Sequence, residues 1–256
     1  MRITTWNVNG LRAALKKGLH EHVRALKPDV LMLQEIRATP AQLPAEERRP
    51  EGWSCVWHPA ERLGYSGVAT WTRDEQWVVG VGMDAVDPEG RILRTRTRKL
   101  QLVNVYLPSG SRSDEAQQRK ERWMERFASW AAALAVTDEP VVLAGDLNIA
   151  HTRADITNVN GNKKNSGFLP HEREWFGELL ASGWTDLLRA HVGEVQGPYS
   201  WWSNRGRARE LDRGWRIDYV LGNAAAARRL KRASIRREGG LTVSDHAPVT
   251  VDLKAR

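Results

Sequence analysis

The segment at residues 141–148, with the sequence VVLAGDLN, most constrains how this chain can fold. Its apolar start is short and β-branched and follows Pro140, which is typical of a fully buried strand. Gly145 gives the backbone freedom where the strand leaves the sheet. If the chain stays extended, the period of two puts Asp146 and Asn148 on one face. The segment therefore predicts a strand that delivers a carboxylate and an amide to a sheet edge.

The same pattern recurs at other predicted strand ends, where apolar runs deliver Asn, Glu, Tyr, Asp or His. A carboxylate can take a proton from water, and an amide can hold that water. Together these groups suit a hard cation such as Mg²⁺, which takes oxygen ligands. One Asp and Asn after a strand often form only a turn, so the recurrence is the more specific signal. The segments are RITTWNVNG at 2–10, VLMLQE at 30–35, VNVYLP at 103–108, RIDYVL at 216–221 and SDHAP at 244–248.

Strand and helix patterns alternate along the chain. Residues 10–26 carry apolar side chains on one stripe, which predicts a helix, and Ser113 caps a second predicted helix that runs to about residue 136. Residues 38–52 are polar and proline-rich, which predicts a surface loop. A third helix is expected over 170–180, and strands are expected at 53–57, 67–71, 77–81, 92–97, 100–106 and 249–253.

Composition bounds the class of protein. The 256 residues contain no linker or low-complexity segment, which favours one domain over residues 1–256, and the net charge of +8 favours an anionic partner. The single cysteine, Cys55, excludes an intramolecular disulfide and fits a reducing compartment. We expect a cytoplasmic, nucleoid-associated protein without a membrane span, because the start lacks a signal pattern and the apolar runs are short.

Three polar or aromatic segments are candidates for the surface that meets this partner. Residues 158–168 are rich in Asn, Gly and Lys and cannot be core, so they form either a flexible tip or a phosphate-binding surface. Residues 199–203 are aromatic and 205–213 are basic, a combination that nucleic-acid binders use for stacking and phosphate contact. The basic run at 228–237 suits a solvated face as well as a DNA contact.

Seven segments carry a resemblance to a known family, and they occur in family order over essentially the whole chain: WNVNG, LQE, YLPSG, GDLNIAH, NGNKKNSGF, GWRIDY and SDHAP. The chain resembles the exonuclease III family of apurinic/apyrimidinic (AP) endonucleases. The resemblance implies an α/β fold in four layers, a sandwich of two packed mixed β-sheets flanked by helices. It also implies that the protein acts on DNA with Mg²⁺, for which Mn²⁺ is a possible substitute.

The resemblance implies a catalytic role for five of the matching residues. Asp146 would be the general base or would orient the attacking water, and Asn148 would help to fix its position. His246 would contact the scissile phosphate, while Asp218 orients and charges its imidazole. Tyr106 would donate to a phosphate oxygen or stabilise the leaving group. A His beside an Asp and a Tyr at a strand end also occur as ordinary structural residues.

The resemblance implies that three residues bind the metal ion or lie beside it. Glu35 would be the principal Mg²⁺ ligand, with Asn7 adjacent, directly or through water. Asp245 would support the metal side or orient neighbouring catalytic groups. Two positions depart from the family pattern: Ser109 stands where many members carry an amide, and Asn9 stands where some carry an Asp metal ligand.

Further residues match family positions that meet DNA. Asn162 and Asn165 match positions that contact DNA or its phosphate, and Asn9 is counted with them. Trp201 and Trp215 match the aromatic lining of an abasic-site pocket, although in a chain with 12 tryptophans both could be ordinary core.

The sequence thus predicts a monomeric Mg²⁺-dependent DNA repair nuclease. It would cut duplex DNA 5′ to abasic sites and remove nucleotides or blocking groups at 3′ ends. One alternative is a catalytically inactive relative that binds RNA as a regulator, but the complete polar set argues against a pure binder. Another is a phosphodiesterase for small phosphoesters, against which the basic balance and the NGNKKN segment favour DNA.

Overall fold

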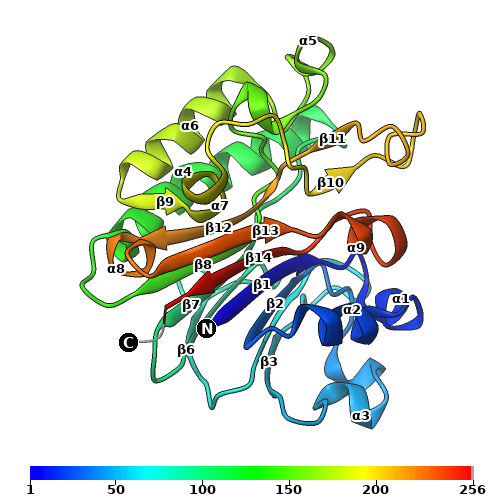
Figure 1. Cartoon of the computed structure of the whole chain (residues 1–256), viewed down its shortest axis with the longest axis vertical. Helices are drawn as coiled ribbons and strands as arrows, with labels where there is room; N and C mark the ends of the chain where they lie inside the picture. The colour runs from blue at the N-terminus through cyan, green and yellow to red at the C-terminus, as the bar shows by residue number, and fades with distance from the viewer. Residues whose placement is uncertain (255–256) are drawn as a thin grey trace.

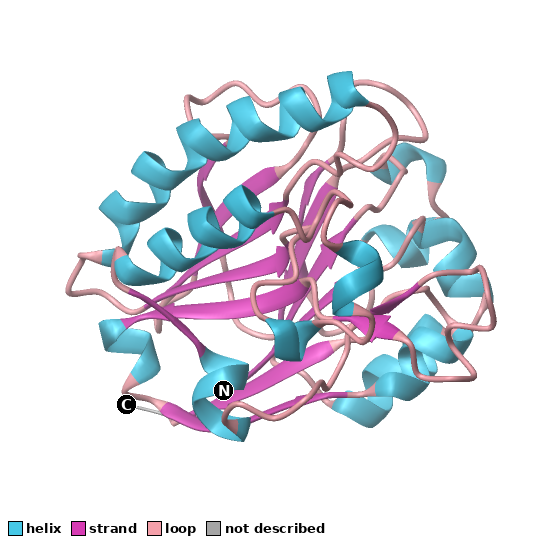
Figure 2. Ribbon diagram, turned by 90° about the horizontal axis from the view of Figure 1, so that it is seen from above, coloured by secondary structure: helices cyan, strands magenta, loops and turns pink. Residues whose placement is uncertain are grey.

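The computed structural model describes residues 1–254, which form two six-stranded mixed β-sheets packed face to face between outer helices (Figures 1 and 2). The four-layered α/β sandwich expected from the resemblance is therefore confirmed. No helix among these residues is long and apolar enough to cross a membrane.

The first sheet has the strand order β13-β14-β1-β2-β4-β3 and contains both ends of the described chain. Only β1 and β2 pair in parallel, and the other neighbours are antiparallel. In sheet order the strands are β13 (Leu230–Ile235), β14 (Val249–Leu253), β1 (Arg2–Asn7), β2 (Val30–Gln34), β4 (Val68–Thr72) and β3 (Ser54–His58).

The second sheet has the order β5-β6-β7-β8-β12-β9, and here only β7 and β8 are parallel. A separate two-stranded ribbon joins β10 (Trp201–Trp202) to β11 (Gly214–Trp215). The strands of the second sheet are β5 (Trp77–Val81), β6 (Ile92–Arg96), β7 (Gln101–Tyr106), β8 (Val141–Asp146), β12 (Asp218–Asn223) and β9 (Trp184–Asp186).

Helices cover the outer face of each sheet, as Figure 2 shows. Against the first sheet pack α1 (Leu11–Lys16) and α2 (Leu19–Leu26), and against the second pack α4 (Asp114–Ala135) and α6 (Pro170–Ala181). The remaining helices are short: α3 (Ala45–Arg48), α5 (Val159–Asn162), α7 (Leu187–Val192), α8 (Ala224–Ala227), α9 (Arg237–Thr242) and the 3₁₀ turns Pro40–Gln42 and Arg153–Asp155.

Three apolar cores hold these layers together. The inner core lies between the sheets and includes Met32 and Val251 from the first and Leu102 and Val142 from the second. The other two cores lie between each sheet and its helices. Strands in the middle of the sandwich are therefore buried on both faces, which explains their nearly continuous apolar sequences.

Two of the predicted helices are confirmed and one is wrong. The Ser113 side chain accepts a hydrogen bond from Ala116 N at the start of α4, as a capping serine should, and α6 starts at Pro170. The single helix expected over 10–26 is instead broken into α1 and α2. Gly18 adopts the left-handed conformation between them (φ 91°), which ends the first helix.

Three segments are more ordered than their composition predicted. Residues 38–52 contain a 3₁₀ turn and α3, and Leu43 between them is buried. Phe168, expected in a loop outside the core, is only 2% exposed. Tyr199 and Trp202 are also buried, so most of the aromatic segment at 199–203 supports the fold rather than forming a surface.

A buried charge network fixes the start of β12. The Arg216 side chain is fully buried and donates to the carboxylates of Asp155 and Asp186, each at 2.6 Å. Arg189 also donates to Asp155, and these contacts hold the pKa of Asp155 below its usual range despite burial. Because unpaired charges are costly to bury, the two carboxylates and Arg216 must be kept together.

We predict that Arg216→Met lowers the free energy of unfolding by about 3–5 kcal/mol, because it leaves two buried carboxylates without this partner. Urea denaturation followed by circular dichroism measures the change. Arg232→Met, on the exposed face of β13, is the matched control and should shift stability by no more than about 0.5 kcal/mol. Equal stability of the two variants would contradict the role given to Arg216.

Candidate active site

Strand direction brings the predicted polar residues to one end of the sandwich. Asn7 and Tyr106 end β1 and β7, and Asp146 ends β8. Strands β12 and β14 run antiparallel to their neighbours β8 and β1, so Asp218 at the start of β12 and His246 just before β14 arrive at the same end. In the register of the second sheet Asp146 pairs with both Tyr106 and Asp218.

A cleft of about 860 Å³ opens at this end of the molecule. Its lining contains all of the sequence-predicted site residues except Asn7 and Asp218, which lie behind it and contact residues that do line it. The predicted residues in the lining are Asn9, Glu35, Tyr106, Asp146, Asn148, Asn162, Asn165, Trp201, Trp215, Asp245 and His246.

His246 lies between two buried carboxylates. Its Nδ1 is 2.9 Å from Asp218 Oδ2, and its Nε2 is 3.9 Å from Asp146 Oδ2. Burial alone would lower the pKa of the imidazole, but the Asp218 carboxylate outweighs burial and raises the pKa to about 10. Burial raises the pKa of the Asp146 carboxyl to about 7, and the charge of Asp218 adds to this effect. His246 is therefore a cation at neutral pH, and Asp146 is poised to exchange a proton.

Ser200 is a site residue that the sequence reasoning missed. Its hydroxyl donates to Asp218 Oδ2 at 2.7 Å and accepts from the backbone N–H groups of Ile217 and Asp218. Ser200 is fully buried and therefore fixes the carboxylate that orients His246. Its neighbours in sequence are aromatic, so nothing in the local pattern marked this serine.

Asn7 links the carboxylates on the two sheets. Its Nδ2 donates to Glu35 Oε2 at 3.0 Å and to Asp146 Oδ2 at 2.8 Å, while its Oδ1 accepts from Asn9 N. Tyr106 lies beside the same carboxylates. Burial and the nearby negative charges of Glu35 and Asp146 raise its pKa well above the usual value, so the phenol remains a hydrogen-bond donor.

The expectation that the chain stays extended from Asp146 to Asn148 is wrong. The strand ends at Asp146, and Asn148 has a left-handed backbone (φ 49°). Its backbone N–H donates to Asp146 Oδ1 at 2.9 Å, and its side-chain Nδ2 donates to Leu107 O at 2.8 Å. Both side chains still line the cleft, but a tight turn rather than strand alternation brings them together.

The oxygen-rich side of the cleft could hold a hard metal ion. Asp146, Asp218 and His246 lie close enough to share an ion, but His246 Nδ1 already faces Asp218 Oδ2 at 2.9 Å. Glu35 and Asp245 lie apart from this cluster. Glu35 accepts from Asn7 and Arg37, and Asp245 accepts from Asn9 at 2.8 Å and from Trp201 at 3.1 Å. This donor set of carboxylate and amide oxygens fits Mg²⁺.

One wall of the cleft is aromatic. The rings of Trp201 and Trp215 meet edge to face with centroids 5.9 Å apart, and Phe168 contacts Trp215 from behind. Both tryptophans are only partly buried, against a small apolar cluster that includes Ile217. On the neighbouring loop Asn165 Nδ2 donates to Asn162 Oδ1 at 2.8 Å, so these two amides act as a unit.

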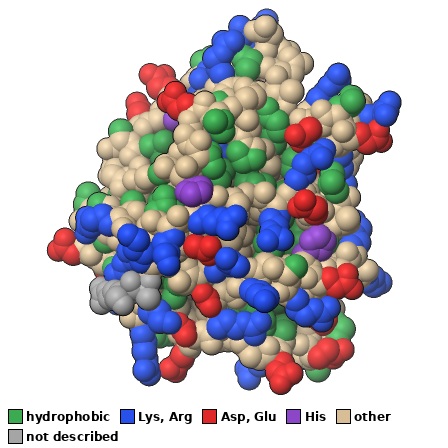
Figure 3. All heavy atoms as spheres, in the orientation of Figure 1, with side chains coloured by type: hydrophobic (Ala, Val, Ile, Leu, Met, Phe, Trp, Pro, Cys, Tyr) green, Lys and Arg blue, Asp and Glu red, His purple; other side chains and the backbone are tan. Residues whose placement is uncertain are grey.

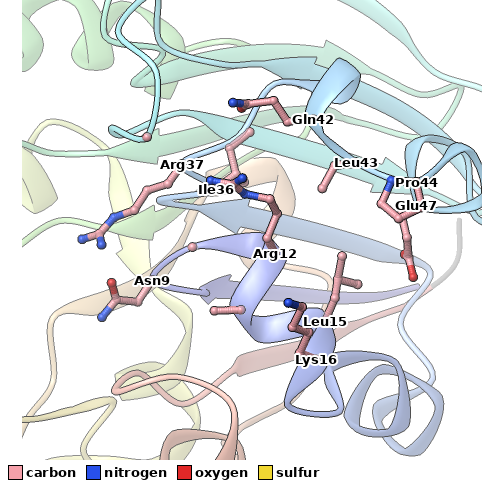
Figure 4. A pocket seen from close by; sticks show the side chains of 13 residues that line it. Asn9, Arg12, Leu15, Lys16, Ile36, Arg37, Gln42, Leu43, Pro44 and Glu47 are labelled. Carbon is pink, nitrogen blue, oxygen red and sulfur yellow. The ribbon is translucent and has the colours of Figure 1, made fainter.

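A second hollow of about 840 Å³ adjoins the cleft beside α1 (Figure 4). It shares Asn9 and Arg37 with the cleft, and Arg12 and Lys16 of α1 add two cations to its wall. Basic side chains also spread over the face drawn in Figure 3, and the exposed cations of the run 228–237 include Arg228, Lys231, Arg232 and Arg236. The cationic lining of the cleft thus continues into the adjoining hollow through Arg12 and Lys16.

Comparison with known proteins agrees with the geometry. The endonuclease/exonuclease/phosphatase family model matches residues 4–246. The exodeoxyribonuclease of Bacillus subtilis is 34% identical over 252 residues, which cover 97% of this chain and 98% of that protein. The DNA repair nuclease APEX1 of Danio rerio is 38% identical over 257 residues, which cover 99% of this chain and 82% of that protein.

Solved structures show the same relationship. An AP endonuclease from Archaeoglobus fulgidus has a TM-score of 0.90 at 26% identity, covering 100% of both chains. The 3′ phosphatase NExo from Neisseria, bound to a product DNA hairpin, has a TM-score of 0.89 at 31% identity, covering 99% of both chains. The chain therefore belongs to the endonuclease/exonuclease/phosphatase family, within its exonuclease III group of AP endonucleases. It is a nuclease-type hydrolase of DNA repair.

We predict that Gly145→Ala disrupts the site through the backbone. A Cβ at Gly145 (φ 150°) would lie 1.8 Å from Val105 O, so β7 and β8 would be forced apart where Tyr106 and Asp146 pair. Overpacking of this kind costs about 1–3 kcal/mol or more, which chemical denaturation measures. The control is Gly80→Ala in the same sheet, where the nearest atom is 3.9 Å away. If both variants are equally stable, the contact at Gly145 does not limit the fold.

Proposed function

We propose that this protein is a Mg²⁺-dependent nuclease that cuts duplex DNA 5′ to abasic sites and removes nucleotides or blocking groups from 3′ ends. The observation that carries the proposal is the placement of His246 between Asp218, at 2.9 Å, and Asp146, at 3.9 Å, in one cleft. Phosphodiester hydrolysis needs an activated water, neutralised phosphoryl oxygens and a stabilised leaving group.

The residues of the cleft divide these tasks. Asp146 orients the water and takes its proton, and the amide of Asn148 helps to hold that water. The His246 imidazolium, held by Asp218, contacts the scissile phosphate and neutralises part of its charge. Tyr106 donates its phenolic proton to a phosphate oxygen or to the departing oxygen.

The metal side of the proposal uses Glu35 as the principal ligand, Asn7 beside it and Asp245 as a supporting group. When bound, Mg²⁺ supplies Lewis-acid stabilisation of phosphoryl charge, and Mn²⁺ is a possible substitute. Asn9, found where some relatives carry an Asp, donates to Asp245 and orients it instead of adding a negative charge. Because the site has fewer acidic ligands, Glu35 contributes the larger share of the Mg²⁺ affinity.

Double-stranded DNA is the proposed partner because cationic side chains line the cleft and continue into the adjoining hollow. Asn9, Asn162 and Asn165 contact its backbone, and Arg12 and Lys16 continue the positive track along α1 (Figure 4). We further propose that residues 1–256 act as one nuclease domain, since both sheets supply residues to the cleft. The protein is proposed to act as a monomer on the cytoplasmic nucleoid.

The alternatives explain less of the site. A regulator that only binds RNA has no need for a buried Asp-His-Asp arrangement, and buried ionisable groups in a cleft are typical of catalytic sites. A phosphodiesterase for small phosphoesters has no use for basic side chains that extend beyond the cleft to Arg12 and Lys16. The nuclease proposal accounts for both features.

We predict that the purified protein cuts a duplex with one abasic site, that EDTA abolishes cleavage and that Mg²⁺ restores it. Asp146→Asn should keep DNA affinity and lose about 10²–10⁴-fold in the single-turnover rate, the usual scale for a general base. Asp138→Asn, in the exposed loop after α4, is the matched control. Near-normal turnover by Asp146→Asn would exclude the assigned base, and cleavage unaffected by EDTA would exclude the metal.

Trp201 and Trp215 are proposed to select the abasic sugar. A sugar without a base can leave the duplex at lower cost than an intact nucleotide, and a small aromatic pocket would accept it alone. Trp215→Ala should therefore stay folded and shift the ratio of abasic-site cleavage to 3′-exonuclease activity by about five-fold or more.

Both rates are measured in one preparation together with the melting temperature. Trp202→Ala, next in the chain after Trp201 and buried, is the control that should lower stability and both activities together. If Trp215→Ala behaves like Trp202→Ala, the aromatic wall supports the fold and selects nothing.

A further inference from the structure

A fully buried lysine on α4 reaches the catalytic turn from the outer helical layer. Lys120 Nζ donates to the carbonyl oxygen of Asn148 at 2.9 Å and to Glu172 Oε1 at 2.6 Å. Both charged side chains have zero exposed surface. The lysine therefore connects the turn that carries Asp146 and Asn148 with the start of α6.

Glu172 carries this connection to the loop at residues 158–169, which bears Asn162 and Asn165. Its second oxygen, Oε2, accepts from Gly167 N at 2.6 Å and from Leu169 N at 3.0 Å. One carboxylate thus anchors the end of the proposed DNA-contacting loop, while Lys120 anchors the catalytic turn to the same carboxylate.

The two anchored segments also touch each other directly. Ala150 N donates to Gly167 O at 2.8 Å. A Cβ at Gly167 (φ 91°) would lie 3.0 Å from Asn148 O and 3.2 Å from the ring of Trp215. With so little free space, a change in the position of Asn148 is transmitted to the loop and to the aromatic wall.

Stability alone does not explain this ion pair. Desolvating two charges can exceed their mutual attraction, so buried ion pairs contribute little net stability compared with apolar residues of the same volume. Burial lowers the pKa of Lys120, against the opposing effect of Glu172, which shows that the site is unfavourable for a cation. What the pair does provide is a directed hydrogen bond to the left-handed Asn148.

We propose that Lys120 is a positioning residue for hydrolysis: held by Glu172, it fixes the backbone of Asn148 and so aligns Asp146 and Asn148 with the DNA-contacting loop. Neither Lys120 nor Glu172 lines the cleft, so the pair acts through the residues it holds. The proposal rests on the proposed function, because it assigns a role within the same site.

The test removes the hydrogen bond to Asn148 O and keeps the hydrogen bonds from Gly167 N and Leu169 N. In the double variant Lys120→Met/Glu172→Gln, the amide oxygen introduced at position 172 can still accept from Gly167 N and Leu169 N, while the thioether introduced at position 120 cannot donate to Asn148 O. Gln117 Nε2 donates to Glu172 Oε1 at 3.1 Å, and a flip of the Gln117 amide turns its Oε1, which has no partner among residues 1–254, toward the new amide. Arg122→Met, which removes an exposed cation from the same helix, is the matched control.

The rate of cleavage of bound abasic DNA is measured under single turnover, and the dissociation constant is measured separately in EDTA. For the double variant we expect the rate to fall roughly 10–100-fold and the dissociation constant to change less than about three-fold. For Arg122→Met we expect both to stay within about three-fold. A folded double variant that cleaves as fast as the parent overturns the proposal.

Two further outcomes of the experiment also test the proposal. If the double variant does not fold, Lys120→Met alone decides, because it also removes the donor to Asn148 O: a cleavage rate within about three-fold of the parent's in that folded variant overturns the proposal. If the parent itself does not cut abasic DNA, the proposed function fails and the positioning role is judged by amide exchange of residues 147–149. That exchange must rise in the double variant and stay unchanged in Arg122→Met; equal exchange in both overturns the proposal.

Discussion

The site depends on hydrogen bonds that cross from one sheet to the other. Asn7, at the end of β1, donates to Asp146 of β8, and His246, just before β14, is held by Asp218 of β12. Neither sheet contains a complete set of catalytic groups, so the chemistry exists only while the two sheets keep their relative position. A small shift between the sheets would separate base, imidazole and metal ligands together.

Buried amides behind the site maintain that position. Gln34 Nε2 at the end of β2 donates to Asn104 Oδ1 of β7 at 2.7 Å, and Asn104 Nδ2 donates to Leu33 O and Ala69 O of the first sheet. Both side chains are fully buried. Apolar side chains can pack in several arrangements, whereas the directional hydrogen bonds of Gln34 Nε2 and of the Asn104 amide form in only one. The polar layer thus gives the apolar core a single register beneath the cleft.

The sequence predicted which residues meet, but not how each is held. Apolar runs ending in Asp146, Glu35 and Tyr106 were sufficient to predict strand ends, because strand periodicity is local. The left-handed turn at Asn148 and the buried hydroxyl of Ser200 depend on partners far away in the chain, which local patterns do not reveal. Lys120 did leave a signal. It lies on the same helical stripe as Met124, Phe127 and Ala131, where a charged residue is unexpected.

Two buried cations hold the chain segments beside the catalytic residues, although a stable core does not need buried charges. Arg216 holds the segment that leads into Asp218, and Lys120 holds the turn that follows Asp146. Arg216 meets Asp155 of the 3₁₀ turn and Asp186 at the end of β9, and Lys120 meets Glu172 in the first turn of α6, so each segment is tied to a neighbouring element. Loops at strand ends would otherwise be free to move, because few of their backbone groups are paired within the sheets. Burial makes these contacts directional and hard to break, and the cleft keeps its shape although much of its wall consists of loops and turns.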